Sequence, residues 1–271
     1  MEIKENLTKN QEKTEKNQEN TSNLQKNNEI EAEKGKTNDA NKLLVLYEDN
    51  HLIVVVKPQN LPSQADSSGD EDMLSLVKQY IKEKYHKEGE AFVGLVHRLD
   101  RPTGGIMVFA KNSKTASRLS QQIKDNSMNK IYYAVTTMVP KERKGTLINY
   151  LKKDEKNNIV KIVPQGEKDA KKAELRYNVL QTEGDYALIE VILVTGRSHQ
   201  IRVQFAGINC PLYGDNKYGK NKSKMSNNLG LWAGRLEFIH PTTKQKMTFA
   251  CPPLECGKPW SYFYMDKYFI R

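Results

Sequence analysis

Short apolar runs rich in β-branched residues, separated by turn residues, dominate the chain from residue 43 onwards. The first two runs are LLVLYED and LIVVVKP, which flank a turn at Asp49-Asn50. Such runs predict strands, and only a few segments show helical spacing instead. Because strands and helices do not alternate regularly, a parallel sheet built from βαβ units is not favoured. The sequence predicts an α+β fold with a mixed, mainly antiparallel sheet and flanking helices.

The positions of the other elements follow from the same patterns. One helix is expected at 71–86, and a second should begin after Asn112 or Ser113, because either residue can cap it. AELRYNVL and YALIEVILV are expected to form a hairpin around Glu183-Gly184. The remaining expected strands are GIMVFAK, KIYYAVTT, RLEFIHP and QKMTFAC.

Residues 1–42 have a different composition. They contain no aromatic residue and no Val, and their charged residues are eight Lys, eight Glu and one Asp. Such a segment cannot bury enough apolar surface to offset its ordering entropy, so we expect a disordered tail at 1–42 and a folded domain at 43–271. The tail therefore has a net charge of −1, and the folded domain carries +11 of the total of +10. A basic body favours a polyanionic partner such as nucleic acid.

Several classes of protein are excluded by what the sequence lacks. It has no apolar stretch of the ~18 residues needed to span a membrane, and its beginning has no apolar core typical of a secretion signal. Its three cysteines fit a reducing compartment, and no second Cys/His pair completes a zinc site beside Cys251 and Cys256. We expect a cytoplasmic monomer with no membrane association and no bound metal.

The segment VGLVHRLDRPTGGIMVFA is unusually polar for its apolar setting. A single carboxylate, Asp100, is flanked in sequence by His97, Arg98 and Arg101. An ionised and well-positioned Asp can serve as a nucleophile or as a base. An ordinary turn with an Asp and surface arginines would use the same residue types, so the segment by itself leaves both interpretations open.

A second polar segment, VTGRSHQIRVQF, follows a nearly all-apolar strand. It supplies four polar side chains, Arg197, His199, Gln200 and Arg202. Polar groups at the end of a buried strand need partners, so a carboxylate or a phosphate is expected there. Helical spacing from Ser198 would direct Ile201 and Phe205 inward. A capped helix with an exposed basic face is the alternative.

A nearby stretch, GDNKYGKN, is close to a phosphate-binding loop pattern. Asn221 stands where that pattern needs a hydroxyl to hold magnesium, so nucleotide hydrolysis is not favoured. We interpret the stretch as a basic loop turned by glycines. Its lysines, together with those that follow, are Lys217, Lys220, Lys222 and Lys224.

Taken together, the motifs resemble those of the RluA-type RNA pseudouridine synthases. HRLDRPTGG resembles the family signature H-R-L-D-x-x-T-S-G, and TGRSHQIRVQF is similar to its later T-G-R-x-H-Q-I-R segment. The resemblance extends to the opening strands LYEDNHLIVVVKP, to KIYYA, to CPLYGDNKYG and to the closing LEFIHPTTKQKMTFACPP. These blocks occur in the family order and cover residues 43–260.

The resemblance implies a catalytic domain at 43–271 that isomerises uridine in RNA without a cofactor. It implies that Asp100 is the nucleophile, that Tyr132 packs against the target base, and that Arg197 is the ion partner of Asp100. Arg98 would fill the place of the extracted base, and Lys217 and Lys220 would meet RNA phosphates. The other residues expected to bind the substrate are His97, Arg101, Thr103, Lys130, His199, Gln200 and Arg202. The RNA would be ribosomal or transfer RNA.

Three positions depart from the family pattern. Gly104 replaces a usual Ser, Gln204 an often-present His, and Asn60 a usual Gly. Two alternative functions are an RNA-binding protein that has lost catalysis and a hydrolase of the glycosidic bond. The hydrolase would need a second carboxylate near Asp100. The candidates for it are Asp66, Asp70, Glu71 and Asp72, which also read as a solvated helix start.

Overall fold

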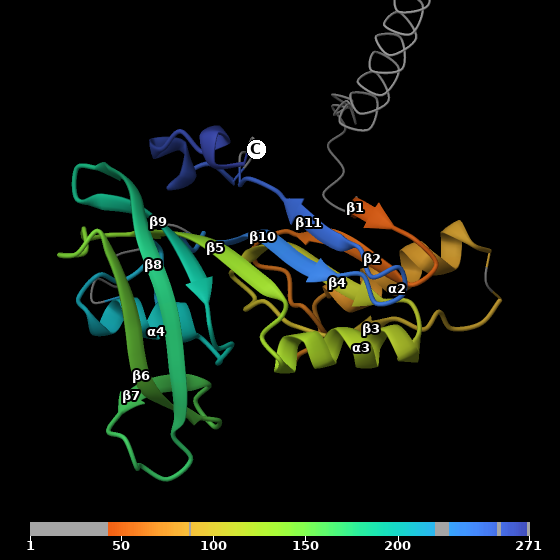
Figure 1. Ribbon diagram of the computed structural model, residues 1–271, viewed down its shortest axis with the longest axis horizontal. Coiled ribbons are helices and arrows are strands. Elements are labelled where there is room, and N and C mark those ends of the chain that lie inside the picture. Colours follow the sequence, from red (N-terminus) through yellow and green to blue (C-terminus); the bar gives the residue numbers. More distant parts are fainter. Residues whose placement is uncertain (1–42, 87, 220–227, 254–255, 270–271) are drawn as a thin grey trace, which may run out of the picture. The chain divides into compact units, whose positions relative to one another are not determined.

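The computed structural model describes residues 43–86, 88–219, 228–253 and 256–269 (Figure 1). The predicted tail at 1–42 and the lysines at 220, 222 and 224 lie outside these residues, so the expectations for them stay predictions. No helix in the described part of the chain is long and apolar enough to cross a membrane.

One twisted sheet contains all the described strands. The first half of the chain gives β1 (Leu44–Glu48), β2 (Leu52–Lys57), β3 (Gly94–Leu95), β4 (Gly104–Ala110) and β5 (Asn129–Thr136). The second half gives β6 (Lys144–Asp154), β7 (Ile159–Val163), β8 (Lys171–Glu183), β9 (Tyr186–Leu193), β10 (Leu231–Ile239) and β11 (Lys246–Ala250). The helices are α2 (Met73–Lys84), α3 (Ser113–Lys124) and α4 (Gln200–Gly207), followed by 3-10 turns at Trp260–Tyr262 and Asp266–Tyr268.

The strand order is β1-β2-β4-β10-β5-β9-β8-β6-β7, with β3 paired to β4 and β11 paired to β10. Within the described residues, the short β4–β10 pairing is parallel and the other strand pairs are antiparallel. The predicted α+β class with a mixed, mainly antiparallel sheet is therefore confirmed. The expected hairpin at Glu183-Gly184 and the two expected helices are also present. Asn112 caps the second helix as predicted, and Asp72 caps the first.

The hairpin formed by β6 and β7 was not expected from the sequence. Its strands carry many charged residues, and only one side of β6 is apolar, at Leu147 and Leu151. The remaining β6 residues are mostly polar or exposed, because β6 and β7 lie at the end of the sheet (Figure 1). The edge strand β7 and the mostly polar β6 beside it give a weak alternation signal.

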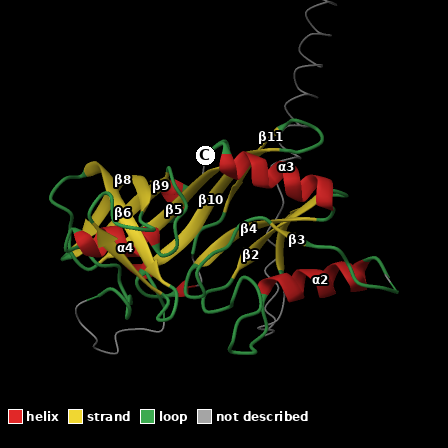
Figure 2. Ribbon diagram, turned by 90° about the horizontal axis from the view of Figure 1, so that it is seen from below, coloured by secondary structure: helices red, strands yellow, loops and turns green. Residues whose placement is uncertain are grey.

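The two faces of the sheet carry different layers. On one face α2 packs through Met73, Val77 and Ile81, and α4 packs through Ile201 and Phe205, against a shared apolar core. On the opposite face, α3 covers β2 and β4, and the C-terminal segment covers the middle of the sheet. Figure 2 shows α2 and α3 on opposite sides of these strands. The face that carries α2 and α4 also carries the candidate site.

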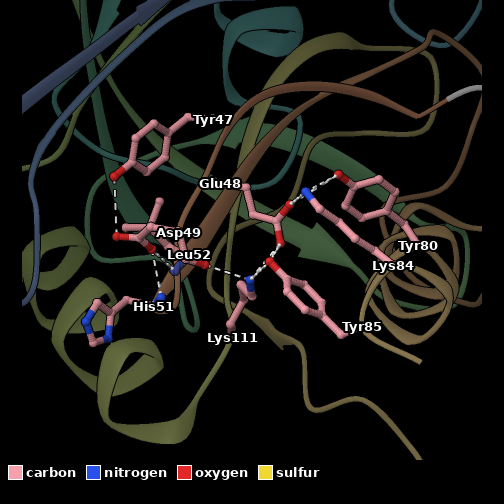
Figure 3. A network of polar contacts seen from close by, with 9 residues as sticks. All are labelled: Tyr47, Glu48, Asp49, His51, Leu52, Tyr80, Lys84, Tyr85 and Lys111. Carbon is pink, nitrogen blue, oxygen red and sulfur yellow. Dashed lines mark hydrogen bonds and ion pairs between the residues drawn. The ribbon is translucent and has the colours of Figure 1, made fainter. Parts of the chain in front are cut away.

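A polar network joins β1 to α2 and to the end of β4 (Figure 3). Glu48 accepts hydrogen bonds from Lys84 and Lys111 at 2.6 Å each and from Tyr85 at 2.8 Å. Burial alone would raise the pKa of Glu48, but these donors lower it to about 2. The carboxylate is therefore ionised at neutral pH, and it anchors the first strand to its neighbours.

Two glycines make the parallel β4–β10 contact possible. Gly105 has φ +123°, and a Cβ atom there would lie 2.3 Å from the Ala233 carbonyl oxygen, so only glycine fits. A Cβ atom at Gly104 would lie 2.2 Å from the indole ring of Trp232. The Trp232 ring thus takes the space that a serine, usual in the family, would need. The departure at Gly104 is compensated by its neighbour across the strands.

We expect Gly104→Ser to destabilise the fold by about 1–3 kcal/mol, because the new side chain must displace a buried indole. Thermal unfolding followed by circular dichroism should show a melting temperature roughly 2–10 °C lower. Gly89→Ser is the matched control, because a Cβ atom at Gly89 meets nothing within 4 Å. Equal melting temperatures for Gly104→Ser and the wild-type protein would show that Trp232 moves aside at no cost.

Candidate active site

A cavity of about 800 Å³ opens on the sheet face that carries α2 and α4. The polar loop at 96–103 and the segment 196–202 form two of its walls. The segment 62–66 and the tip of the β6–β7 hairpin form others. The two polar motifs identified in the sequence therefore meet in one place, although about a hundred residues separate them.

The loop that carries Asp100 is held by the segment immediately after β2. The Ser63 hydroxyl donates to the carbonyl oxygen of Leu99 at 2.8 Å and accepts from the Leu99 amide at 3.0 Å. The Thr103 amide donates to the carbonyl oxygen of Asp100 at 2.9 Å and closes a turn. These bonds fix the backbone on both sides of the carboxylate.

Lys57 adds a buried cation behind the same loop. Its side-chain nitrogen donates to the carbonyl oxygens of Pro58, Leu61 and Arg101, at 3.0, 2.6 and 3.1 Å. Burial lowers the pKa of Lys57 to about 7, and the nearby charge of Asp100 opposes that shift. Three carbonyl acceptors match the three hydrogens of an ammonium group. Lys57 thus ties the loop to β2 from the inside.

His97 continues the sheet where β3 stops. Its Nε2 atom accepts a hydrogen bond from the Val108 amide of β4 at 3.0 Å, in the place of a backbone acceptor. Because Nε2 accepts, the neutral ring carries its proton on Nδ1. Burial, assisted by the positive charge of Lys130, lowers the pKa of His97 to about 3. The imidazole is therefore neutral at physiological pH.

Arg202 is the ionic centre of the site. Its Nε and one terminal nitrogen donate to the two carboxylate oxygens of Asp215, both at 2.8 Å. Its other terminal nitrogen lies 3.5 Å from the Asp100 carboxylate. Burial would lower the pKa of Arg202, but the hydrogen bonds and charge of Asp215 raise it overall. One buried guanidinium therefore joins a fully buried carboxylate to a partly exposed one.

The expected ion pair between Arg197 and Asp100 is wrong. Arg197 lines the cavity, but its Nε donates to the Lys172 carbonyl oxygen of β8 at 3.0 Å. His199 adopts a left-handed conformation, with φ 51°, and turns the chain just before α4. This turn leaves Arg197 beside β8 and places Arg202, on the first turn of α4, next to Asp100.

Tyr132 and Lys130 reach the cavity from β5. Tyr132 is 7% exposed, and burial, with a contribution from the nearby charge of Asp100, raises the pKa of its phenol. The phenol is therefore neutral. Lys130 is also largely buried, and burial lowers its pKa. Asp100, Tyr132 and Lys130 therefore line the same cavity.

The other residues predicted to bind the substrate differ in whether they face the cavity or are bonded to other parts of the protein. Arg98 is exposed at the cavity wall, whereas Arg101 binds the carboxylates of Asp70 and Asp66. Gln200 lines the cavity, but its amide holds the turn before α4 through Thr195 and the amide of Arg197. The others that line the cavity are Thr103, His199 and Lys217, and Lys220 lies outside the described residues.

The family model for RNA pseudouridylate synthases matches residues 51–207, which is more than half of the chain. The chain belongs to this family. The segment matched includes Asp100, Tyr132 and Arg202. The resemblance to RluA-type synthases that the sequence motifs indicated is thereby confirmed.

Individual relatives agree with this assignment. An RNA pseudouridine synthase of Mycoplasma pneumoniae is 35% identical over 207 residues, which cover 76% of this chain and 65% of the relative. Ribosomal large subunit pseudouridine synthase D of Borreliella burgdorferi is 33% identical over 181 residues, covering 66% and 55%. The chain thus spans less than two thirds of the length of these two relatives. The solved structure of human RNA Pseudouridylate Synthase Domain Containing 4 matches with a TM-score of 0.65 at 25% identity, covering 77% of this chain and 87% of that chain.

Two further departures from the family pattern have structural explanations. Asn60 has φ 67°, a left-handed conformation that asparagine tolerates better than most residues with a side chain. Gln204 is buried, and its amide nitrogen donates to the Leu147 carbonyl oxygen and to Asn149, at 3.0 and 2.8 Å. Gln204 therefore binds β6 and takes no part in the cavity wall.

Sequence reasoning missed three residues that shape this candidate site. Lys57, Ser63 and Asp215 hold the loop of Asp100 or the guanidinium of Arg202. One signal was available for Lys57, because a lysine directly after five apolar strand residues is out of place unless it is exposed or paired. Asp215 stood in a loop interpreted only as basic.

We expect His97 to remain neutral between about pH 5 and 8, the range in which an ordinary histidine titrates. Long-range ¹H–¹⁵N spectra of histidine-labelled protein should show the Nδ1–H tautomer throughout, with His97→Gln identifying the signals. The pKa of His97 in the folded protein lies below its value of ~6.5 in the unfolded chain. Falling pH from about 6.5 towards about 3 therefore protonates the unfolded state first, so this residue lowers the free energy of unfolding in acid. A titration midpoint near ~6.5 for His97 would contradict its assigned environment.

Proposed function

We propose that this protein is an RNA pseudouridine synthase that isomerises specific uridines in structured RNA, either ribosomal or transfer RNA. The observation that carries the proposal is the Asp100 carboxylate, 3.5 Å from the Arg202 guanidinium, in a cavity that Tyr132 also lines. The match of residues 51–207 to the family model for RNA pseudouridylate synthases also supports the proposal. The Borreliella relative is named as a ribosomal large subunit enzyme.

The reaction rearranges bonds within one nucleotide. The bond between N1 of uracil and C1′ of the ribose breaks, the base rotates, and a bond forms between C5 and C1′. The C5 hydrogen leaves as a proton, and N1 gains a proton, so no co-reactant is needed. Asp100 attacks the nucleotide as a nucleophile and leaves again when the new bond is complete.

The other residues act by position and charge. Arg202 keeps Asp100 in one orientation and stabilises its negative charge before the attack and after release. Tyr132 is neutral and packs against the extracted base. A stacked uridine must leave its helix to reach the cavity, at a cost of a few kcal/mol. Arg98 fills the vacated place, because its planar guanidinium can stack on bases and bind phosphates.

A hydrolase that cuts the glycosidic bond is less well supported. That chemistry would use a second carboxylate close to Asp100. The Asp215 side chain is fully buried and both its oxygens are bound to Arg202. Asp66 lines the cavity but is bonded to Ser68 and lies 3.8 Å from Arg101. Glu155, at the tip of the β6–β7 hairpin, also lines the cavity but is paired with Lys153. None of these three carboxylates is placed as a free acid or base.

We expect Asp100→Asn to lower the rate of pseudouridine formation at least about a thousandfold, because the amide is not a nucleophile. Pseudouridine should be mapped in total RNA from cells with and without the gene. A site that is lost in the deletion should return with the wild-type gene and not with Asp100→Asn. Asp125→Asn, which changes an exposed carboxylate at the end of α3, is the matched control and should restore the site. If no mapped site depends on the gene, the proposed function is refuted.

We expect the two arginines to differ when each is changed to lysine. Arg202→Lys removes the two-pronged hydrogen bonding to Asp215 and the contact with Asp100, and should lower kcat about a hundredfold. Arg197→Lys should lower kcat less than about tenfold, because Arg197 binds a backbone carbonyl instead. Single-turnover assays on an RNA containing the mapped uridine measure both. If Arg197→Lys lowers kcat more than Arg202→Lys does, Arg197 and not Arg202 is the functional partner of Asp100.

A further inference from the structure

The hydroxyl group of Tyr218 connects three segments around the candidate active site. It lies 2.6 Å from Nδ1 of His199, which lines the cavity. It also accepts a hydrogen bond from the Val160 amide of β7 at 2.9 Å. Tyr218 itself belongs to the loop after Asp215, and its own amide donates to the Asp215 carboxylate at 3.1 Å.

The hydrogen bonds of this hydroxyl favour one position for the His199 proton. Because the oxygen already accepts from Val160, its own proton is free to be donated, and His199 Nδ1 is the acceptor within reach. His199 is then neutral, with its proton on Nε2. Burial lowers the pKa of His199, and Arg202 and Lys217 add to this against the opposing charges of Asp100 and Asp215. The ring therefore offers one N–H group on the side away from Tyr218.

The ring of Tyr218 also contacts the ionic centre of the site. The central carbon of the Arg202 guanidinium lies 5.2 Å from the Tyr218 ring centroid, in the range of a cation–π contact. The ring is packed against an apolar cluster that contains Leu151, Val160 and Val203. Its position is therefore set by β6, β7 and α4 together, and it limits where the plane of the guanidinium can lie.

The β6–β7 hairpin is part of the same arrangement. Its tip reaches the cavity through Lys153, Glu155 and Asn158. Lys217 donates to the Asn158 carbonyl oxygen at 2.8 Å, so the loop of Tyr218 is attached to the hairpin at a second point. The hairpin is thus joined to His199 and Arg202 through Tyr218.

We propose that Tyr218 is a positioning residue for uridine isomerisation. It holds His199 as the neutral tautomer with its proton on Nε2, directed to the substrate cavity, and it holds the Arg202 guanidinium against Asp100. This inference rests on the proposed function for its catalytic part. Its structural part, the tautomer of His199, can be measured without RNA.

The first test is spectroscopic and uses the full chain with ¹⁵N-labelled histidine. In the wild-type protein, His199 should show the Nε2–H tautomer, the opposite of His97, with His199→Gln identifying the signals. Tyr218→Phe removes the donor that favours the neutral ring, so His199 should lose this single tautomer and its pKa should rise. Tyr177→Phe is the matched control, because the Tyr177 hydroxyl donates to Glu142 and lies outside the cavity lining. It should leave the His199 signals unchanged.

The second test is kinetic. Tyr218→Phe should lower kcat about tenfold, the rate equivalent of one lost hydrogen bond, with KM close to the wild-type value. The acid limb of the pH–rate profile should move to higher pH, because His199 would then be protonated more easily. Tyr218→Leu also removes the ring beside Arg202 and should lose more. Melting temperatures of all variants show whether they are folded at the assay temperature.

The outcomes separate the two hypotheses. If Tyr218→Phe leaves the tautomer of His199 and the pH profile unchanged, the positioning role is overturned, even if the protein becomes less stable. If the wild-type protein forms no pseudouridine in any RNA while the tautomer shifts as expected, the proposed function fails, and the structural link between Tyr218 and His199 stands.

Discussion

The candidate site depends on one buried guanidinium. Arg202 is 6% exposed and binds two carboxylates, one fully buried and one facing the cavity. A buried arginine without a partner would be very costly, and removing one member of such a pair typically costs about 3–5 kcal/mol. Asp215 therefore stabilises Arg202 in the folded protein. Because Asp215 binds Nε and one terminal nitrogen of the guanidinium, the other terminal nitrogen faces Asp100. The buried Arg202–Asp215 ion pair therefore positions the charged Asp100 carboxylate that the proposed chemistry needs.

Asp100 is also fixed from the opposite side. Lys57 and Ser63 bind backbone atoms of its loop, and the imidazole of His97 replaces a backbone acceptor at the end of β3. None of these contacts touches the Asp100 carboxylate itself. A site whose charges are held in advance does not have to reorganise during the reaction, which is how enzymes gain most from electrostatic stabilisation. The charge of Asp100 and the backbone that carries it are therefore held by partners inside the protein.

The departures from the family pattern show how a fold absorbs substitutions. Gly104 leaves space that the Trp232 ring fills, and Asn60 adopts the left-handed conformation that a glycine would adopt. Gln204 binds β6 and so connects α4 to the hairpin. Each change is matched locally, by a neighbouring ring, by a tolerated φ angle or by a hydrogen bond. None of them alters a group that faces Asp100.

The sequence by itself determined the fold class, most strands and helices, and the two polar motifs, because hydrophobic periodicity and turn residues act over short distances. It also identified Asp100 and Tyr132 as neighbours, through the resemblance to a family. It missed the β6–β7 hairpin, which lies at the end of the sheet and buries few of its side chains. Only the tertiary structure decided that Arg202, and not Arg197, meets Asp100, because the left-handed turn at His199 directs the two side chains differently. It also revealed Lys57 and Asp215 as partners, since a buried ion pair is formed by residues that are distant in the chain and leaves no periodic pattern in the sequence.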